Sequence, residues 1–138
     1  MRTTFLLVFL VACGGSPTPT GTVCPDPDPG TLTYENFGKS FMEQYCTWCH
    51  AKDIPRSMRN GAPIYHDYDT LVGVLQTPDH IDEQAGSGPK ADNDFMPPGR
   101  CPSVAGGKAD RDCPQPTEEE RQKLAEWIAC ERARPHTF

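Results

Sequence analysis

Cys46, Cys49 and His50 lie within five residues of one another, in the stretch YCTWCHAKD at 45–53. Two thiols and an imidazole at this spacing can bind a metal ion, exchange electrons as a disulfide, or hold a prosthetic group covalently. Each chemistry requires different residues elsewhere in the chain, so the remaining sequence can distinguish the three.

The rest of the sequence disfavours a metal site and a redox-active disulfide. A structural zinc site needs four ligands, usually completed by a second Cys or His pair at short spacing, and Cys101, Cys113 and Cys130 are too scattered to form one. A thioredoxin-like redox motif follows a strand and opens a helix. Cys46 instead ends a predicted helix, and no strand precedes it.

The third chemistry is covalent attachment of haem c, which takes two thiols about one helical turn apart and a histidine directly after the second. Cys46 and Cys49 match the two vinyl groups of one porphyrin, and His50 follows in position to bind the iron. The sequence therefore predicts one covalently attached haem c.

Met96 is the predicted second axial ligand of the iron. It lies 46 residues after His50 (96 − 50), which is enough chain to pass around the haem. Pro97 and Pro98 fix φ and stiffen the loop NDFMPPGR. A methionine that only fills the core would not be expected in so polar a loop.

Other sulfur and imidazole groups are weaker candidates, and His80 is the main alternative to Met96. Met42 lies on the apolar face of a predicted helix, and Met58 is only eight residues (58 − 50) from His50. His66 is expected in a loop and His136 in the carboxyl-terminal tail.

Three amphipathic helical segments must position these groups, at 33–46, 67–84 and 117–130. Each repeats apolar residues at spacings of three and four, as one face of a helix does. The apolar residues of the three segments are, in order, Phe37, Phe41 and Tyr45; Leu71, Val74, Leu75 and Ile81; Leu124, Trp127 and Ile128.

The ends of these segments carry recognisable signals. Thr33 is a candidate N-cap, Thr117 and Glu120 form a capping box, and Pro78 is expected to kink or break the second segment. No alternating strand pattern is found, so we predict an all-α fold. The 15 prolines and 12 glycines in 138 residues make it loop-rich, with a single domain over 33–138.

The amino-terminal sequence predicts export. Residues 1–12 combine an early arginine with an apolar run too short to span a bilayer, as in a signal peptide. Leu10 to Cys13 resembles a bacterial lipobox, so Cys13 is the predicted lipidation site. The Gly14 that follows favours the outer membrane over the inner one, on its periplasmic side. Residues 13–32, rich in Pro and Gly, are predicted to be a flexible, solvated tether.

At this point the chain resembles the small monohaem cytochrome c family over about residues 33–131. The resemblance rests on Cys46-Thr47-Trp48-Cys49-His50, on Met96-Pro97-Pro98 and on the last helix with Trp127. It implies three main helices wrapped around one covalently bound haem.

The same resemblance assigns further roles. Gly38, eight residues before Cys46, would let the first helix cross the last one at Leu124 and Trp127. Pro63 would offer its carbonyl to the second ring nitrogen of His50, and Pro55 is a second candidate for this role.

Two disulfides are predicted from the remaining cysteines, because free thiols are unusual in an oxidising compartment. Cys101 and Cys113 bracket a short Gly-containing loop. Since the terminal helices would cross in the implied fold, Cys24 would pair with Cys130.

The predicted function is single-electron transfer, since two axial ligands leave the iron no open position. A haem-based gas sensor and an accessory subunit of a larger oxidoreductase remain alternatives. No catalytic constellation is found, so we do not expect an enzyme. The net charge of −6 argues against nucleic acid and suits redox partner proteins with a basic docking face.

Overall fold

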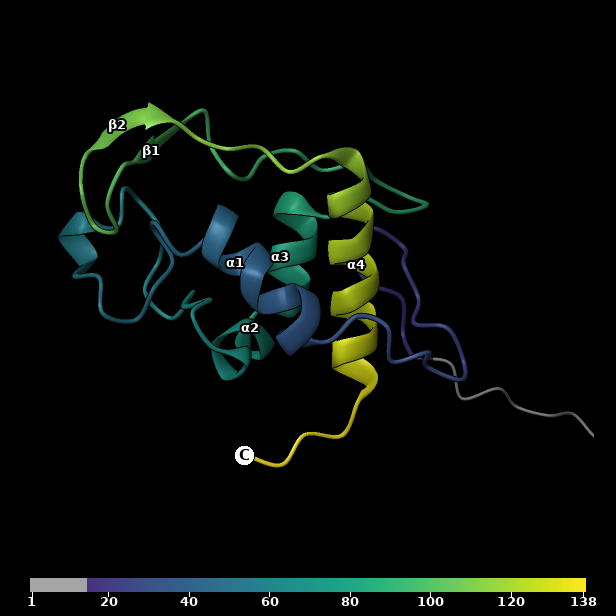
Figure 1. Cartoon of the computed structure of the whole chain (residues 1–138). Helices are drawn as coiled ribbons and strands as arrows, with labels where there is room; N and C mark the ends of the chain where they lie inside the picture. Colours follow the sequence, from purple (N-terminus) through teal and green to yellow (C-terminus); the bar gives the residue numbers. More distant parts are fainter. Residues whose placement is uncertain (1–14) are drawn as a thin grey trace, which may run out of the picture.

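The computed structural model describes residues 15–138 (Figure 1). In chain order its elements are a π-helical turn η1 (Tyr34–Gly38), helix α1 (Lys39–Tyr45), a 3₁₀ turn η2 (Arg56–Met58), helices α2 (Leu71–Gln76) and α3 (Pro78–Ala85), strands β1 (Arg100–Pro102) and β2 (Ala109–Asp112), and helix α4 (Glu118–Ala133). The predicted signal peptide and the predicted lipidation site Cys13 lie outside the described residues.

Helix α4 is the longest element, and α3 and η1 pack against it, with the other helices all on one side of it (Figure 1). Thr117 and Glu120 form the predicted capping box at its start. Its buried face carries Leu124, Trp127 and Ile128, which join the apolar residues of α1 and α3 in one core. The predicted apolar stripe of this helix is therefore confirmed.

Gly38 lies where η1 and α1 cross α4. A Cβ atom at this position would overlap the ring of Trp127, so only glycine permits the close approach. The expected contact between Gly38 and Trp127 is confirmed. Beyond the crossing, Phe41, Met42 and Tyr45 of α1 are buried in the core.

The second amphipathic segment is broken where the sequence predicts it. Helix α2 ends at Gln76, and Pro78 is the first residue of α3, a position where its missing N–H costs nothing. Thr70 caps α2 by accepting a hydrogen bond from the amide of Gly73.

A β-hairpin makes the all-α prediction wrong. Strands β1 and β2 pair antiparallel, with Arg100 opposite Asp112. The strands are three and four residues long, too short and polar to show an alternating pattern. A disulfide between Cys101 and Cys113 closes the hairpin. This covalent bond holds the two short strands together, as the burial of an apolar face does in longer strands.

The prediction of three main helices wrapped around a haem is also wrong. The structure has four α-helices in the described residues, and three of them are only six to eight residues long. The first predicted segment divides into η1 and α1, and the second divides at Thr77. Long irregular stretches connect these short helices.

Residues 18–24 pack against the helices, which differs from the solvated tether predicted for 13–32. Thr20 is fully buried, and its amide and hydroxyl donate to the two carboxylate oxygens of Asp82 in α3, at 2.7 and 3.0 Å. Cys24 forms the predicted disulfide with Cys130 of α4. Side-chain hydroxyls and one disulfide anchor a segment that has no apolar stripe.

Candidate functional site

The CysXXCysHis stretch forms a compact turn at the end of α1. Cys46 is the C-cap of this helix, and its carbonyl accepts hydrogen bonds from the amides of Cys49 and His50, at 3.2 and 3.0 Å. Both thiols are free, whereas the other four cysteines of the described chain form the two predicted disulfides. The motif thus presents two unpaired sulfurs and one imidazole together.

A cavity opens beside this turn and holds about 890 Å³ of space, including the part open to solvent. Its wall combines three separate segments of the chain, at 45–50, 60–68 and 80–101. The lining residues are Tyr45, Cys46, Cys49, His50, Asn60, Gly61, Ala62, Pro63, Tyr68, His80, Ile81, Gln84, Ala85, Met96, Pro97, Pro98 and Cys101. The structure therefore brings together Cys46, Cys49, His50 and Met96, the predicted haem residues.

One ring nitrogen of His50 forms a hydrogen bond, and the other does not. Nδ1 lies 3.1 Å from the carbonyl oxygen of His66. A carbonyl can only accept, so Nδ1 carries the proton and Nε2 keeps its lone pair. Burial lowers the pKa of His50 to about 4, which keeps the ring neutral near pH 7. The ring also stacks on Tyr68, with centroids 4.8 Å apart.

The carbonyl role predicted for Pro63 belongs to His66. Pro63 does line the cavity, but the oxygen that accepts from His50 comes from a residue three positions later. Pro55, the second candidate, is the N-cap of η2. Arg59 donates to the same His66 oxygen at 2.8 Å, a contact for which the sequence has no signal.

The backbone around Met96 is held by Arg121, a buried residue of α4. Arg121 donates to the carbonyls of Ala85, Asn93 and Met96, at 3.1, 3.0 and 3.0 Å, and also contacts the side chain of Gln115. The predicted ligand loop is thus fixed through its backbone, while the Met96 residue stays 38% exposed.

Gln115 completes this clamp. Its side-chain amide donates to the carbonyls of Pro97 and Pro98, at 3.2 and 3.3 Å. The sequence analysis missed the clamp, although a signal was present: Arg121 lies on the same helical face as Leu124 and Ile128, where a charged residue must find buried partners.

Of the other methionines and histidines considered as iron ligands, His80 lies at the cavity. His80 lines the same cavity as Met96, so both sulfur and imidazole are available there. Met42 is buried in the core, Met58 is exposed, and neither lines the cavity. His136 lies in the tail, with Nε2 on the carbonyl of Glu131.

The two free thiols are poorly suited to disulfide exchange. Burial raises the pKa of Cys46 to about 12 and also raises the pKa of Cys49. The thiolate is the reactive form, and redox-active cysteines have lowered pKa values. This agrees with the sequence argument against a thioredoxin-like motif.

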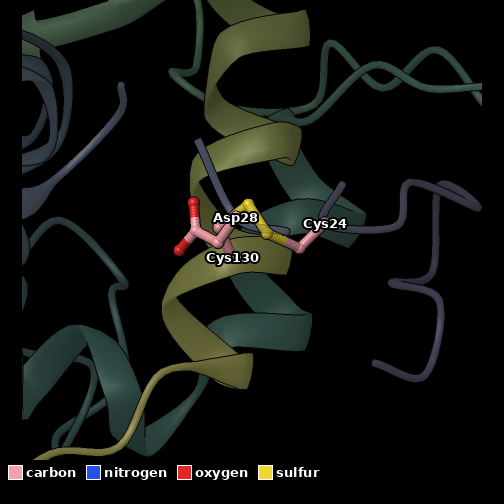
Figure 2. Close-up of side chains that lie close together, drawn as sticks. All are labelled: Cys24, Asp28 and Cys130. Carbon is pink, nitrogen blue, oxygen red and sulfur yellow. A yellow bond between two sulfur atoms is a disulfide. The ribbon is translucent and has the colours of Figure 1, made fainter. Parts of the chain in front are cut away.

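A second group of potential ligands lies at Cys24, Asp28 and Cys130 (Figure 2). The two sulfurs are bonded to each other and offer no thiolate. The Asp28 carboxylate accepts from Arg134 at 2.6 and 3.0 Å, and its pKa is lowered by this contact. The group is a structural anchor of the amino-terminal segment.

No helix in residues 15–138 is long and apolar enough to cross a membrane.

No protein-family model, curated protein or solved structure matches this chain. The resemblance to the small monohaem cytochrome c family is accordingly wrong, and the hairpin and two disulfides do not give that fold. The resemblance rested on a five-residue motif, one loop and one helix. Patterns this short recur on unrelated folds and do not establish a family.

Proposed function

We propose that this chain binds one haem covalently through Cys46 and Cys49 and transfers single electrons between partner proteins. The observation that carries the proposal is the shared cavity, which gathers the two free thiols, His50 and Met96 from separate segments. The proposal rests on these residues and does not depend on membership of a known family.

The residues that line the cavity fit this group. Cys46 and Cys49 would supply the two thioether bonds, and Nε2 of His50 would bind the iron, since Nδ1 is already engaged. Met96 would be the second residue to hold the iron, with His80, which lines the same cavity, as the alternative. When bound, the haem iron gains and loses one electron.

The chain's own part in electron transfer is to bind, orient and shield. Tyr68 and the His66 carbonyl fix the plane of the His50 ring. Ile81 and Ala85, both buried, form an apolar part of the cavity wall. Such a wall would limit the access of water and raise the reduction potential of a bound haem. If His50 and Met96 both held the iron, it would keep no position for a substrate, so we propose an electron carrier rather than an enzyme.

The proposed location is the periplasmic side of the bacterial outer membrane, with Cys13 as a lipid anchor. This part of the proposal rests on the sequence of residues 1–14. The proposed partners are redox proteins with a basic docking face, since the chain carries a net charge of −6.

Haem staining after denaturing electrophoresis tests the proposal. The exported protein should keep haem-linked peroxidase activity on the gel, because thioether bonds survive denaturation, and the double variant Cys46→Ser, Cys49→Ser should lose it. The matched control is Cys24→Ser, Cys130→Ser, which removes two cysteines that do not line the cavity and should still stain. An unstained wild-type protein, or a stained Cys46→Ser, Cys49→Ser variant, would refute covalent haem.

A second candidate function is the binding of a small gas at the iron after Met96 leaves. The 38% exposure of Met96 favours it, because a partly exposed side chain can turn away while Arg121 keeps the backbone of its loop in place. Rapid binding of carbon monoxide to the reduced wild-type protein would support gas binding, and absence of binding would support the electron carrier.

A further inference from the structure

We propose that Arg59 is a positioning residue for His50, because it holds the backbone carbonyl on which the orientation of the His50 ring depends. The inference rests on the proposed function in one respect: His50 is taken to be the iron ligand. The contact itself is a feature of the chain alone.

The two side chains share one oxygen atom. The His66 carbonyl accepts from Nδ1 of His50 at 3.1 Å and from Nη2 of Arg59 at 2.8 Å. A carbonyl oxygen has two lone pairs, so both hydrogen bonds form together. The position of this oxygen decides which His50 nitrogen is protonated and which stays available to a metal.

No backbone amide of the described residues donates to that oxygen. His66 lies between η2 and α2, in a stretch with neither helix nor strand, and the preceding Tyr65 has φ +70°. The nearest backbone hydrogen bond runs from the Tyr68 amide to the His50 carbonyl at 2.8 Å. It holds the chain two residues further on, whereas Arg59 holds the His66 carbonyl itself.

Arg59 is well placed to be that anchor. It is only 2% exposed, and its Nη1 lies 2.7 Å from the carboxylate of Asp67. Its Nε is buried without a partner, so the guanidinium is connected through its two terminal nitrogens. Nη2 donates to the His66 carbonyl, and Nη1 forms an ion pair with the Asp67 side chain. A buried guanidinium with one carboxylate and one carbonyl partner is a stiff, charge-assisted link.

Nuclear magnetic resonance of the exported, haem-loaded protein in its reduced state tests the proposal. The readout is the exchange rate of the His50 Nδ1 proton with deuterated water. Loss of a charge-assisted hydrogen bond should speed this exchange at least about tenfold in Arg59→Met, and Arg59→Lys, which keeps the charge and one donor, should recover part of the protection.

Two controls separate positioning from general loosening. Arg56→Met removes an exposed charge three residues away and should leave the His50 proton unchanged. In the same spectra the Trp127 Nε1 proton, which donates to Glu131 at 2.9 Å, should exchange at the wild-type rate. Equal acceleration of both protons, or no acceleration in Arg59→Met, would overturn the proposal.

Two further measurements apply if Arg59→Met does not fold or if the exported protein carries no haem. If Arg59→Met does not fold, the same measurement is made on Arg59→Lys. A His50 Nδ1 exchange rate equal to that of the wild type would then overturn the proposal. If the exported protein carries no haem, the proposed function fails, and ¹⁵N shifts of the His50 ring then test Arg59 separately. A single Nδ1–H tautomer in the wild type and mixed tautomers in Arg59→Met would support it, while identical tautomers would overturn it.

Discussion

At the scale of single residues, contact geometry decides what each group can do. His50 is neutral because it is buried, and its Nε2 is free because Nδ1 donates to a backbone carbonyl. Cys46 and Cys49 are unpaired, with raised pKa values. These features favour a bound prosthetic group over thiol exchange.

Gly38 allows a prediction at this scale. Its φ of −58° and ψ of −45° suit any residue, and alanine would gain up to about 1 kcal/mol of helix propensity. A Cβ there would nevertheless overlap the Trp127 ring, and overpacking of this kind costs about 1–3 kcal/mol or more. We therefore expect Gly38→Ala to lower the free energy of unfolding, measured by urea denaturation.

The matched control for this prediction is Gly99→Ala. A Cβ at Gly99 would meet nothing within 4 Å, so we expect a change within about 0.5 kcal/mol, as for most surface substitutions. If the two variants were equally stable, the close crossing of η1 and α4 would not be a steric requirement.

At the scale of elements, α4 connects the core to the cavity. Its apolar face packs on α1 and α3, while Arg121 reaches from the same face to the loop that carries Met96. Gln115, just before the helix, holds the two prolines that follow Met96. One helix therefore sets both the packing and the position of the proposed ligand loop.

Loosening this loop should weaken the proposed Met96 ligand. Gln115→Ala removes two hydrogen bonds of about 0.5–1.5 kcal/mol each from the carbonyls of Pro97 and Pro98. We expect carbon monoxide to bind the reduced haem protein faster than in the wild type, as followed by absorption. The rate should remain below that of Met96→Ala, which removes the ligand itself.

Gln122→Ala is the control, because Gln122 is an exposed glutamine on α4 whose side chain donates to Glu118 and not to the Met96 loop. It should bind carbon monoxide at the wild-type rate. Equal rates for Gln115→Ala and wild type would mean that Arg121 alone holds the loop.

At the scale of the whole molecule, two disulfides close loops of very different length. Cys24 and Cys130 are 106 residues apart, and Cys101 and Cys113 only 12. The chain-entropy relation gives about 5 kcal/mol of stabilisation for the first bond and about 3 kcal/mol for the second. Replacing Cys24 and Cys130 by serine should therefore lower the free energy of unfolding more than replacing Cys101 and Cys113.

Urea denaturation of the two double-serine variants measures this difference. The larger loss should come with release of residues 18–24 from the helices, detected as faster hydrogen exchange at the Thr20 amide, which now donates to Asp82. A larger loss from the hairpin pair would show that local strain or packing outweighs loop entropy.

The packed amino-terminal segment also limits the proposed anchor. Four residues (18 − 13 − 1) separate Cys13 from buried Thr18, so the domain would lie within about 20 Å of the lipid. Cys13→Ser should move the protein from the membrane to the soluble fraction on cell fractionation, since the acyl chains would be its attachment. Continued membrane association of Cys13→Ser would identify a partner as the anchor.

Short-range patterns in the sequence determined much of the local structure. The capping box at Thr117, the helix break at Pro78 and the turn at Cys46–His50 all depend on residues a few positions apart, where propensity and sterics act directly. Both disulfide pairings were also predicted, although the pairing of Cys24 with Cys130 came from a family resemblance that proved wrong.

Only the tertiary structure decided the contacts between distant segments. It assigned the partner of His50 to His66 rather than Pro63, packed residues 18–24 on α3 and α4, and formed a hairpin without an apolar pattern. Backbone carbonyls are chemically alike in every residue, so the sequence cannot say which one a side chain will meet. That choice depends on the path of the loops, which is fixed by buried polar anchors such as Arg59 and Arg121 and by covalent bonds.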